Sequence, residues 1–184
     1  MSNSLLKAFP EYNILSVSDK SFHYASGGIG PYYIDLRRGC NNPEIFSVIL
    51  KHYSNLSEGE KEHLLFVGVP TTGVVYATGL ALLYKKPLAV MEKNNPERIH
   101  AFSYVSLNNY IQSHVELITN SEQSAFLGLE DMGVITATGL GIYLNRPSAI
   151  LRRVQKGHGT SKTVEASLNK FKEQGITTLY ICND

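Results

Sequence analysis

The sequence predicts an α/β protein in which helices flank a mainly parallel sheet, and two observations carry this prediction. The first is an internal repeat: residues 65–93 and residues 125–153 align without a gap. The second is the alternation, along the chain, of short apolar runs with helical stripes of apolar residues. With 184 residues and 43% hydrophobic content, the chain can bury one good core. We therefore expect a single domain over residues 1–184, although two small halves that share a sheet fit the same pattern.

Each copy of the repeat is expected to form a strand, a turn, a helix and a second strand. An apolar run ends at Gly68 or Gly128, a small polar turn follows, and a long apolar stretch then leads to Pro87 or Pro147 and a second apolar run. Such a unit pairs its strands in parallel and has one favoured handedness. The turn after the first strand is a common place for a phosphate, because exposed amide groups and a helix N-terminus favour an anion there.

The turns also contain a second glycine, Gly73 or Gly133, which would let a ligand approach the backbone closely. Glycine is common in any tight α/β turn, so the turns alone leave a purely structural interpretation open. Neither copy has GxGxxG spacing or a GxxxxGK[ST] string, so dinucleotide and P-loop sites have no support.

Local signals predict the remaining elements. On the strand before the first copy, Tyr33 should face one side and Tyr32 and Ile34 the other. Gly175 should end the last helix. The predicted elements are a strand at 32–36, a helix from an Asn42 cap to about residue 54, a polar break at 94–98, a strand at 102–107, a helix at 107–118, a helix at 163–174 and a strand at 177–182.

The composition excludes several classes of protein. A formal net charge of +1 gives no long-range attraction to a nucleic-acid backbone, so nucleic acid is not expected as the main partner. Cys40 and Cys182 form no CxxC or His-spaced pattern, which argues against structural zinc and a disulfide framework. There is no basic and apolar leader and no run of 18 apolar residues, so we expect a cytoplasmic protein with no membrane partner.

Three strings, in this order, resemble the orotate phosphoribosyltransferase family: GPYYIDLR at 30–37, GVPTTGVVYATGLAL at 68–82 and RRVQKGHGTSK at 152–162. The resemblance implies a type I phosphoribosyltransferase fold and a homodimer. It also implies a Mg²⁺ complex of phosphoribosyl pyrophosphate (PRPP), from which the phosphoribosyl group is transferred to orotate with release of pyrophosphate. Such a reaction develops positive charge on the ribosyl carbon and negative charge on the leaving diphosphate, so it needs cations near the diphosphate and exclusion of water.

The resemblance also implies roles for individual residues. It places Arg152 and Arg153 on the diphosphate, and Lys156 and His158, as catalytic residues, on a mobile loop that reaches a neighbouring subunit's site. It gives the base pocket to Tyr32 and Tyr33 and the pyrophosphate turn to Thr71, Thr72 and Gly73. Each role has a structural alternative. The cationic segment could be a solvated basic loop, and the two tyrosines could be one core ring and one surface ring.

One motif of the family is not intact. In the family this motif consists of two acids, a hydrophobic pair and Thr-Thr-Gly, and it should bind the ribose and its phosphate. Glu130 and Asp131 are the nearest match to the two acids. The other placement is Asn183 and Asp184, where the chain stops as the loop should begin. No protein ligand to the metal is assigned. A non-catalytic regulator that binds PRPP or a nucleotide, and a subunit that supplies its basic loop to a partner, therefore stand as alternatives to the enzyme.

Overall fold

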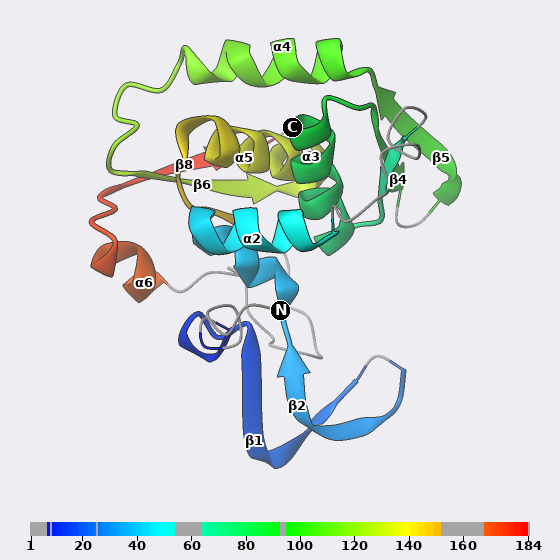
Figure 1. Cartoon of the computed structure of the whole chain (residues 1–184), viewed down its shortest axis with the longest axis vertical. Helices are drawn as coiled ribbons and strands as arrows, with labels where there is room; N and C mark the ends of the chain where they lie inside the picture. The colour runs from blue at the N-terminus through cyan, green and yellow to red at the C-terminus, as the bar shows by residue number, and fades with distance from the viewer. Residues whose placement is uncertain are drawn as a thin grey trace.

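The computed structural model describes residues 7, 9–24, 26–53, 64–92, 95–151 and 168–183, and it confirms an α/β fold (Figure 1). In the part of the chain so described, no helix is long and apolar enough to cross a bilayer. The elements are β1 (Leu15–His23), β2 (Ile29–Ile34), the 3₁₀ helix η1 (Leu36–Asn41), α2 (Pro43–Tyr53), β3 (Phe66–Gly68), α3 (Thr72–Tyr84), β4 (Leu88–Glu92), β5 (Asn95–Phe102), α4 (Tyr104–Val115), β6 (Ser124–Leu129), α5 (Glu130–Leu144), β7 (Ser148–Leu151), α6 (Leu168–Glu173) and β8 (Thr178–Cys182).

Each copy of the repeat builds its own small sheet. The strand orders are β3-β4-β5 for the first copy and β7-β6-β8 for the second, and β1 and β2 form a separate hairpin. In both copies the two repeated strands pair in parallel and in the same register, with Phe66 opposite Leu88 and Phe126 opposite Ser148. The predicted strand, turn, helix and strand are therefore confirmed in both copies, but among the described strands the copies do not share one sheet.

The copies are joined through their helices. Helices α3 and α5 pack on each other, with α2 on one side of the pair and α4 on the other (Figure 1). Leu50 of α2 packs against Gly79 of α3, and Ile111 of α4 packs in the same way against Gly139 of α5. One large apolar cluster contains buried residues from both copies. The repeat thus extends to the preceding helix, and the core is continuous across it.

Close packing explains the glycine near the end of the first strand of each copy, which is the last residue of β3 and the last but one of β6. A Cβ on Gly68 would lie 2.8 Å from the Cα of Val74, and a Cβ on Gly128 would lie 2.5 Å from the Cα of Val134. Any side chain at these positions would push the helix away from its strand. The two glycines therefore fix how closely α3 sits on β3 and α5 on β6.

The region between the copies differs from the prediction. A polar break at 94–98 and a strand at 102–107 were expected, but β5 is a strand from Asn95 to Phe102 that pairs antiparallel with β4. Helix α4 then begins at Tyr104, because the Ser103 hydroxyl oxygen accepts a hydrogen bond from the Ser106 amide at 3.1 Å. A capping serine explains why the helix starts earlier than its apolar stripe suggested.

Other predicted boundaries are close to the observed ones. Asn42 caps α2 as expected, with its side-chain oxygen accepting from the Ile45 amide at 3.0 Å. Gly175 follows α6 with a φ of 75°, the left-handed value that suits glycine, and β8 lies where the last strand was predicted. Of the helix predicted at 163–174, residues 163–167 lie outside the described residues.

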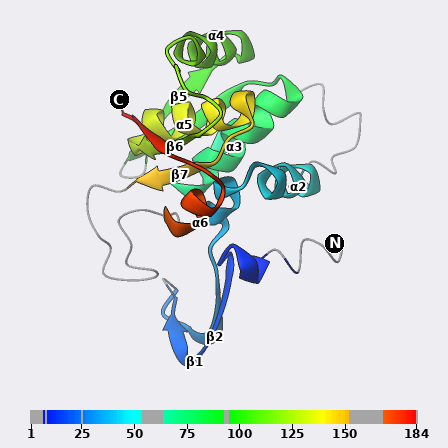
Figure 2. The ribbon, with the colours of Figure 1, turned by 90° about the vertical axis from the view of Figure 1, so that its left-hand side faces the viewer.

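The hairpin of β1 and β2 projects from the body of the molecule (Figure 2). Strand β2 ends at Ile34, before the predicted end at residue 36, because Leu36 already belongs to η1. The alternation was predicted correctly: Val17 and its partner Tyr32 are exposed, whereas the Tyr33 ring on the other face contacts the Phe22 ring.

Candidate active site

The turns of the two copies face the same cavity. It has a volume of about 550 Å³, and it contains three of the residues singled out in the sequence, Thr71, Glu130 and Asp131. Its other lining residues are Pro70, Val90, Glu92, His100, Phe102, Met132 and Ile135. We call this space the turn cavity. Residues from both halves of the chain thus contribute to one space.

Helices α3 and α5 begin at the turn cavity and run in the same direction away from it. Residues at their C-terminal ends, Leu82 and Leu83 of α3 and Ile142 and Tyr143 of α5, line a second cavity. The partial positive charges of two helix N-termini therefore converge on the turn cavity. The Thr71 side chain makes no capping hydrogen bond to α3. This arrangement favours an anion between the two turns.

Carboxylates line the same space. Glu130 and Asp131 lie in the first turn of α5, where negative charge is favoured by the helix N-terminus. Glu92, at the end of β4, is engaged by His100, with Nε2 at 2.9 Å from the carboxylate, and by Arg98, with Nε at 3.3 Å. A ligand that enters here meets both carboxylates and helix N-termini, which suits an anion that carries a divalent cation.

The two turn glycines have different surroundings. A Cβ on Gly133 would overlap the carbonyl oxygen of Cys182, so this glycine lets the end of β8 approach α5. A Cβ on Gly73 would meet no atom closer than 3.6 Å. At Gly73 the neighbours therefore lie at ordinary contact distance, whereas at Gly133 the chain itself fills the space beside the backbone.

The structure separates the other predicted residues. Thr72 and Gly73 line a neighbouring hollow of about 310 Å³ that also contains Tyr76. Tyr32 and Tyr33 are on the hairpin and are not among the residues that line the turn cavity. Tyr33 is held in place, because its hydroxyl oxygen accepts a hydrogen bond from the Arg37 guanidinium at 3.3 Å.

The predicted cationic residues Arg152, Arg153, Lys156 and His158 lie outside the described residues, as does Asp184. Strand β7, which leads to them, is described as far as Leu151. Leu151 pairs with Leu129, the residue that immediately precedes Glu130. Leu151, the last described residue before the cationic segment, thus lies beside the end of β6, where the turn of the second copy begins.

Sequence reasoning missed Glu92, His100 and Phe102 as lining residues of the turn cavity. One signal was available: in the gapless alignment of the copies, Glu92 is the equivalent of Arg152. The pairing of β5 with β4, which brings His100 and Phe102 to the cavity, had no comparable signal.

Paired strand-to-helix turns of this kind are typical of α/β proteins that bind phosphate groups at helix N-termini. No family model matches the chain. The bifunctional enzyme PyrF/PyrE of Nostoc sp. is 37% identical over 82 residues, which are 45% of this chain and 17% of that protein. The orotate phosphoribosyltransferase of Methanocorpusculum labreanum is 29% identical over 135 residues, 72% of this chain and 75% of that one. The solved orotate phosphoribosyltransferase of Aeropyrum pernix aligns with 95% of this chain and 90% of its own, at 17% identity and a TM-score of 0.44.

The sequence similarities confirm the resemblance: over part of its length the chain is similar to curated orotate phosphoribosyltransferases. The matches to several of these curated relatives span less than half of the relative's length.

Proposed function

We propose that this chain transfers the phosphoribosyl group of PRPP to orotate, giving orotidine 5'-monophosphate and pyrophosphate in pyrimidine biosynthesis. The observation that carries the proposal is the convergence of both repeat turns, at the N-termini of α3 and α5, on one cavity of about 550 Å³. The homologues named as this enzyme favour it over a non-catalytic regulator.

The turn cavity suits a diphosphate with its metal. Two helix N-termini attract the diphosphate, which would approach the first turn at Thr71, with Gly73 beside it in the neighbouring hollow. Thr72 follows Thr71 at the start of α3 and completes this turn. Glu130 and Asp131 would otherwise repel the diphosphate, so a cation between them would relieve the repulsion.

Mg²⁺ fits this set of donors. It is commonly held by one or two carboxylates together with the oxygens of a substrate phosphate, and it keeps several waters. Glu130 and Asp131 would hold it, and when bound it would neutralise charge on the diphosphate. Among the described residues no group of three or more His, Cys, Asp or Glu side chains is arranged to hold a metal, so we propose a cation that enters with the substrate.

Lys156 and His158 are proposed as the catalytic residues, with Arg152 and Arg153 on the diphosphate. Leu151, the last described residue of β7, pairs with Leu129 at the second turn, which supports this assignment. Cations close to the leaving diphosphate stabilise the charge that grows on it, and a segment that covers the site excludes water.

The base is proposed to bind at Tyr32 and Tyr33. The hydrogen bond from Arg37 and the contact with Phe22 fix the Tyr33 ring, while half of the Tyr32 surface is exposed.

The hairpin has an exposed apolar face, formed by Val17, Tyr32 and Ile34, which supports a homodimer. We further propose a single domain over the whole chain, which the continuous core supports, and a cytoplasmic location, which two free thiols support.

The test follows the loss of orotate absorbance in the presence of PRPP and Mg²⁺. We expect turnover by the unmodified chain and a loss of roughly 10²–10³-fold in kcat for Lys156→Ala, the effect of removing one group that stabilises developing charge. Lys172→Ala, which removes an exposed lysine of α6, is the matched control and should keep full activity. PRPP binding without turnover would instead identify a regulator, and absence of PRPP binding would overturn the proposal altogether.

A further inference from the structure

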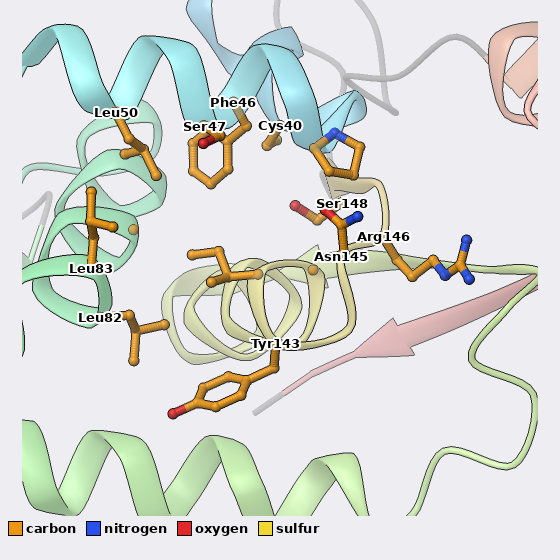
Figure 3. Close-up of a pocket in the computed structure, with 14 residues that line it drawn as sticks. Cys40, Phe46, Ser47, Leu50, Leu82, Leu83, Tyr143, Asn145, Arg146 and Ser148 are labelled. Carbon is orange, nitrogen blue, oxygen red and sulfur yellow. The ribbon is translucent and has the colours of Figure 1, made fainter.

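The second cavity lies at the opposite ends of α3 and α5 from the turn cavity, between these helices and α2 (Figure 3). Its volume is about 490 Å³, within the range of small-molecule sites. Cys40, Leu82 and Ser148 form a buried floor, whereas Leu83 and Tyr143 are 48% and 39% exposed at the rim. We call this space the helix-end cavity.

Comparison of the two copies shows why the space exists. Ser148 occupies the position of Leu88 in the first copy, where the leucine side chain is fully buried. Gly141 takes the place of Ala81, but a Cβ there would lie 2.9 Å from the carbonyl oxygen of Arg146, so this exchange opens no space. The exchange of Leu88 for Ser148 reduces side-chain volume and puts a hydroxyl where the first copy has an apolar group. The second copy has therefore lost packing atoms at Ser148, which lines the helix-end cavity.

The walls are apolar and the charges are few. Figure 3 shows Phe46 and Leu50 of α2 facing the cavity from one side, and Leu82 of α3 on another. No aspartate or glutamate is found among the described residues that line the cavity. Arg146, the one charged residue in this described lining, extends away from the cavity. A cationic ligand would therefore find no carboxylate among these residues, and the Arg146 guanidinium is not directed at an anion in the cavity.

The polar groups favour a ligand that donates hydrogen bonds. Two helices end at this cavity, and the carbonyl groups at a helix C-terminus carry partial negative charge. The Gly141 carbonyl oxygen already accepts from the Asn145 and Arg146 amides, whereas the Ile142 carbonyl oxygen accepts one backbone hydrogen bond, from Asn145, and keeps a second lone pair. The Asn145 side chain and the hydroxyl groups of Ser47 and Ser148 add further possible acceptors. Burial raises the pKa of the Cys40 thiol to about 12, so the floor stays uncharged at neutral pH.

We propose that the helix-end cavity binds a small, neutral aromatic molecule that carries an N–H donor. Such a molecule buries its ring between Phe46 and Leu82 and offers its donor to the acceptors at the helix ends. The site is separate from the turn cavity, so its occupation requires neither PRPP nor the cationic segment.

Indole is the probe, because the chain contains no tryptophan and indole fluorescence can be excited selectively. We expect saturable binding with a change in indole emission. Indene has the same shape without the N–H group, and in competition with indole it should bind several-fold more weakly. Absence of saturable indole binding, or equal affinity for indene, would overturn the proposal.

Two variants locate the binding. Ser148→Leu restores the first-copy residue and should reduce indole affinity at least tenfold. Ser47→Phe acts from the exposed rim and should do the same without changing the buried floor. Ser113→Phe, at an exposed serine of α4, is the matched control and should bind indole as the unmodified chain does. Unchanged affinity in folded Ser47→Phe would refute this location, whether or not Ser148→Leu folds.

Discussion

The close packing of α5 on β6 predicts a large cost for the smallest possible side chain at Gly128. The new methyl group of Gly128→Ala would lie 2.5 Å from the Cα of Val134 and 2.6 Å from the carbonyl oxygen of Gly133, whereas ordinary contact begins at 3.4 Å. Because both neighbours are backbone atoms, no rotamer change relieves the overlap. The helix must move by about 1 Å relative to the strand, which would disturb its packing against α3.

Overpacking of this kind lowers the free energy of unfolding by about 1–3 kcal/mol, and an overlap with backbone atoms belongs at the upper end of this range. We therefore expect Gly128→Ala to lower the free energy of unfolding by about 3 kcal/mol. Gly68→Ala meets the Val74 Cα at 2.8 Å and should lose about 2 kcal/mol. Gly73→Ala is the control: it makes only ordinary contacts, and alanine favours a helix by up to about 1 kcal/mol over glycine, so its stability should be unchanged or slightly raised.

Urea unfolding followed by far-ultraviolet circular dichroism measures all three variants. Close packing would not explain these glycines if Gly128→Ala unfolded at the same urea concentration as the unmodified chain, or if Gly73→Ala were the least stable of the three. A stable Gly73→Ala variant also tests binding. Since its fold would be intact, a drop in its PRPP affinity would come from the changed turn at Gly73 and not from unfolding.

Two further predictions concern buried groups. Asp35 is 3% exposed and its carboxylate lies 2.5 Å from Arg37 Nε and 3.4 Å from Arg38 Nε, so Asp35→Ala should lower the free energy of unfolding, measured in urea, by about 3–5 kcal/mol. Glu92→Ala breaks a largely exposed ion pair and should lower it by less than about 1 kcal/mol. Equal losses in the two variants would contradict a buried ion-pair role for Asp35. Burial raises the pKa of Cys40 from 9.0 to about 12, so above pH 9 the unfolded chain loses this proton before the folded chain does. Stability should then fall by about 1.4 kcal/mol per pH unit from this group between pH 9 and 12, and Cys40→Ala should flatten the pH dependence of urea unfolding; an unchanged slope would show that the thiol is accessible.

The repeat explains which parts of the fold were predictable. Equivalent residues such as Gly68 and Gly128 identify the same strand-to-helix packing twice, so each copy supports the interpretation of the other. Strand β5 was not predictable in the same way. Its residues are almost all exposed, and it is a strand because it pairs with β4, which is a tertiary effect that its own polar sequence does not show.

The candidate site was predictable only in part, for a similar reason. Thr71 and Glu130 were each singled out from their own copy, but the sequence does not state that α3 and α5 pack in the same direction and bring the two turns to one cavity. His100 enters that cavity through the pairing of β5 with β4. Local patterns thus singled out three residues of the turn cavity, while the packing of helices and strands decided which residues meet there.

The proposed function predicts one PRPP site in each chain, although the turn is present twice. After β4 the first copy continues into antiparallel β5, and Glu92, the equivalent of Arg152, is held by His100 and Arg98. Glu92 cannot donate a hydrogen bond to a diphosphate as an arginine at this position could, and the first copy carries no counterpart of Lys156. Because both turns face the same cavity, the proposed function would place one ligand between them. Calorimetric titration with PRPP and Mg²⁺ should give a stoichiometry of one per chain, and Asp131→Asn should weaken that single event; two equivalent sites per chain would show that each turn binds independently.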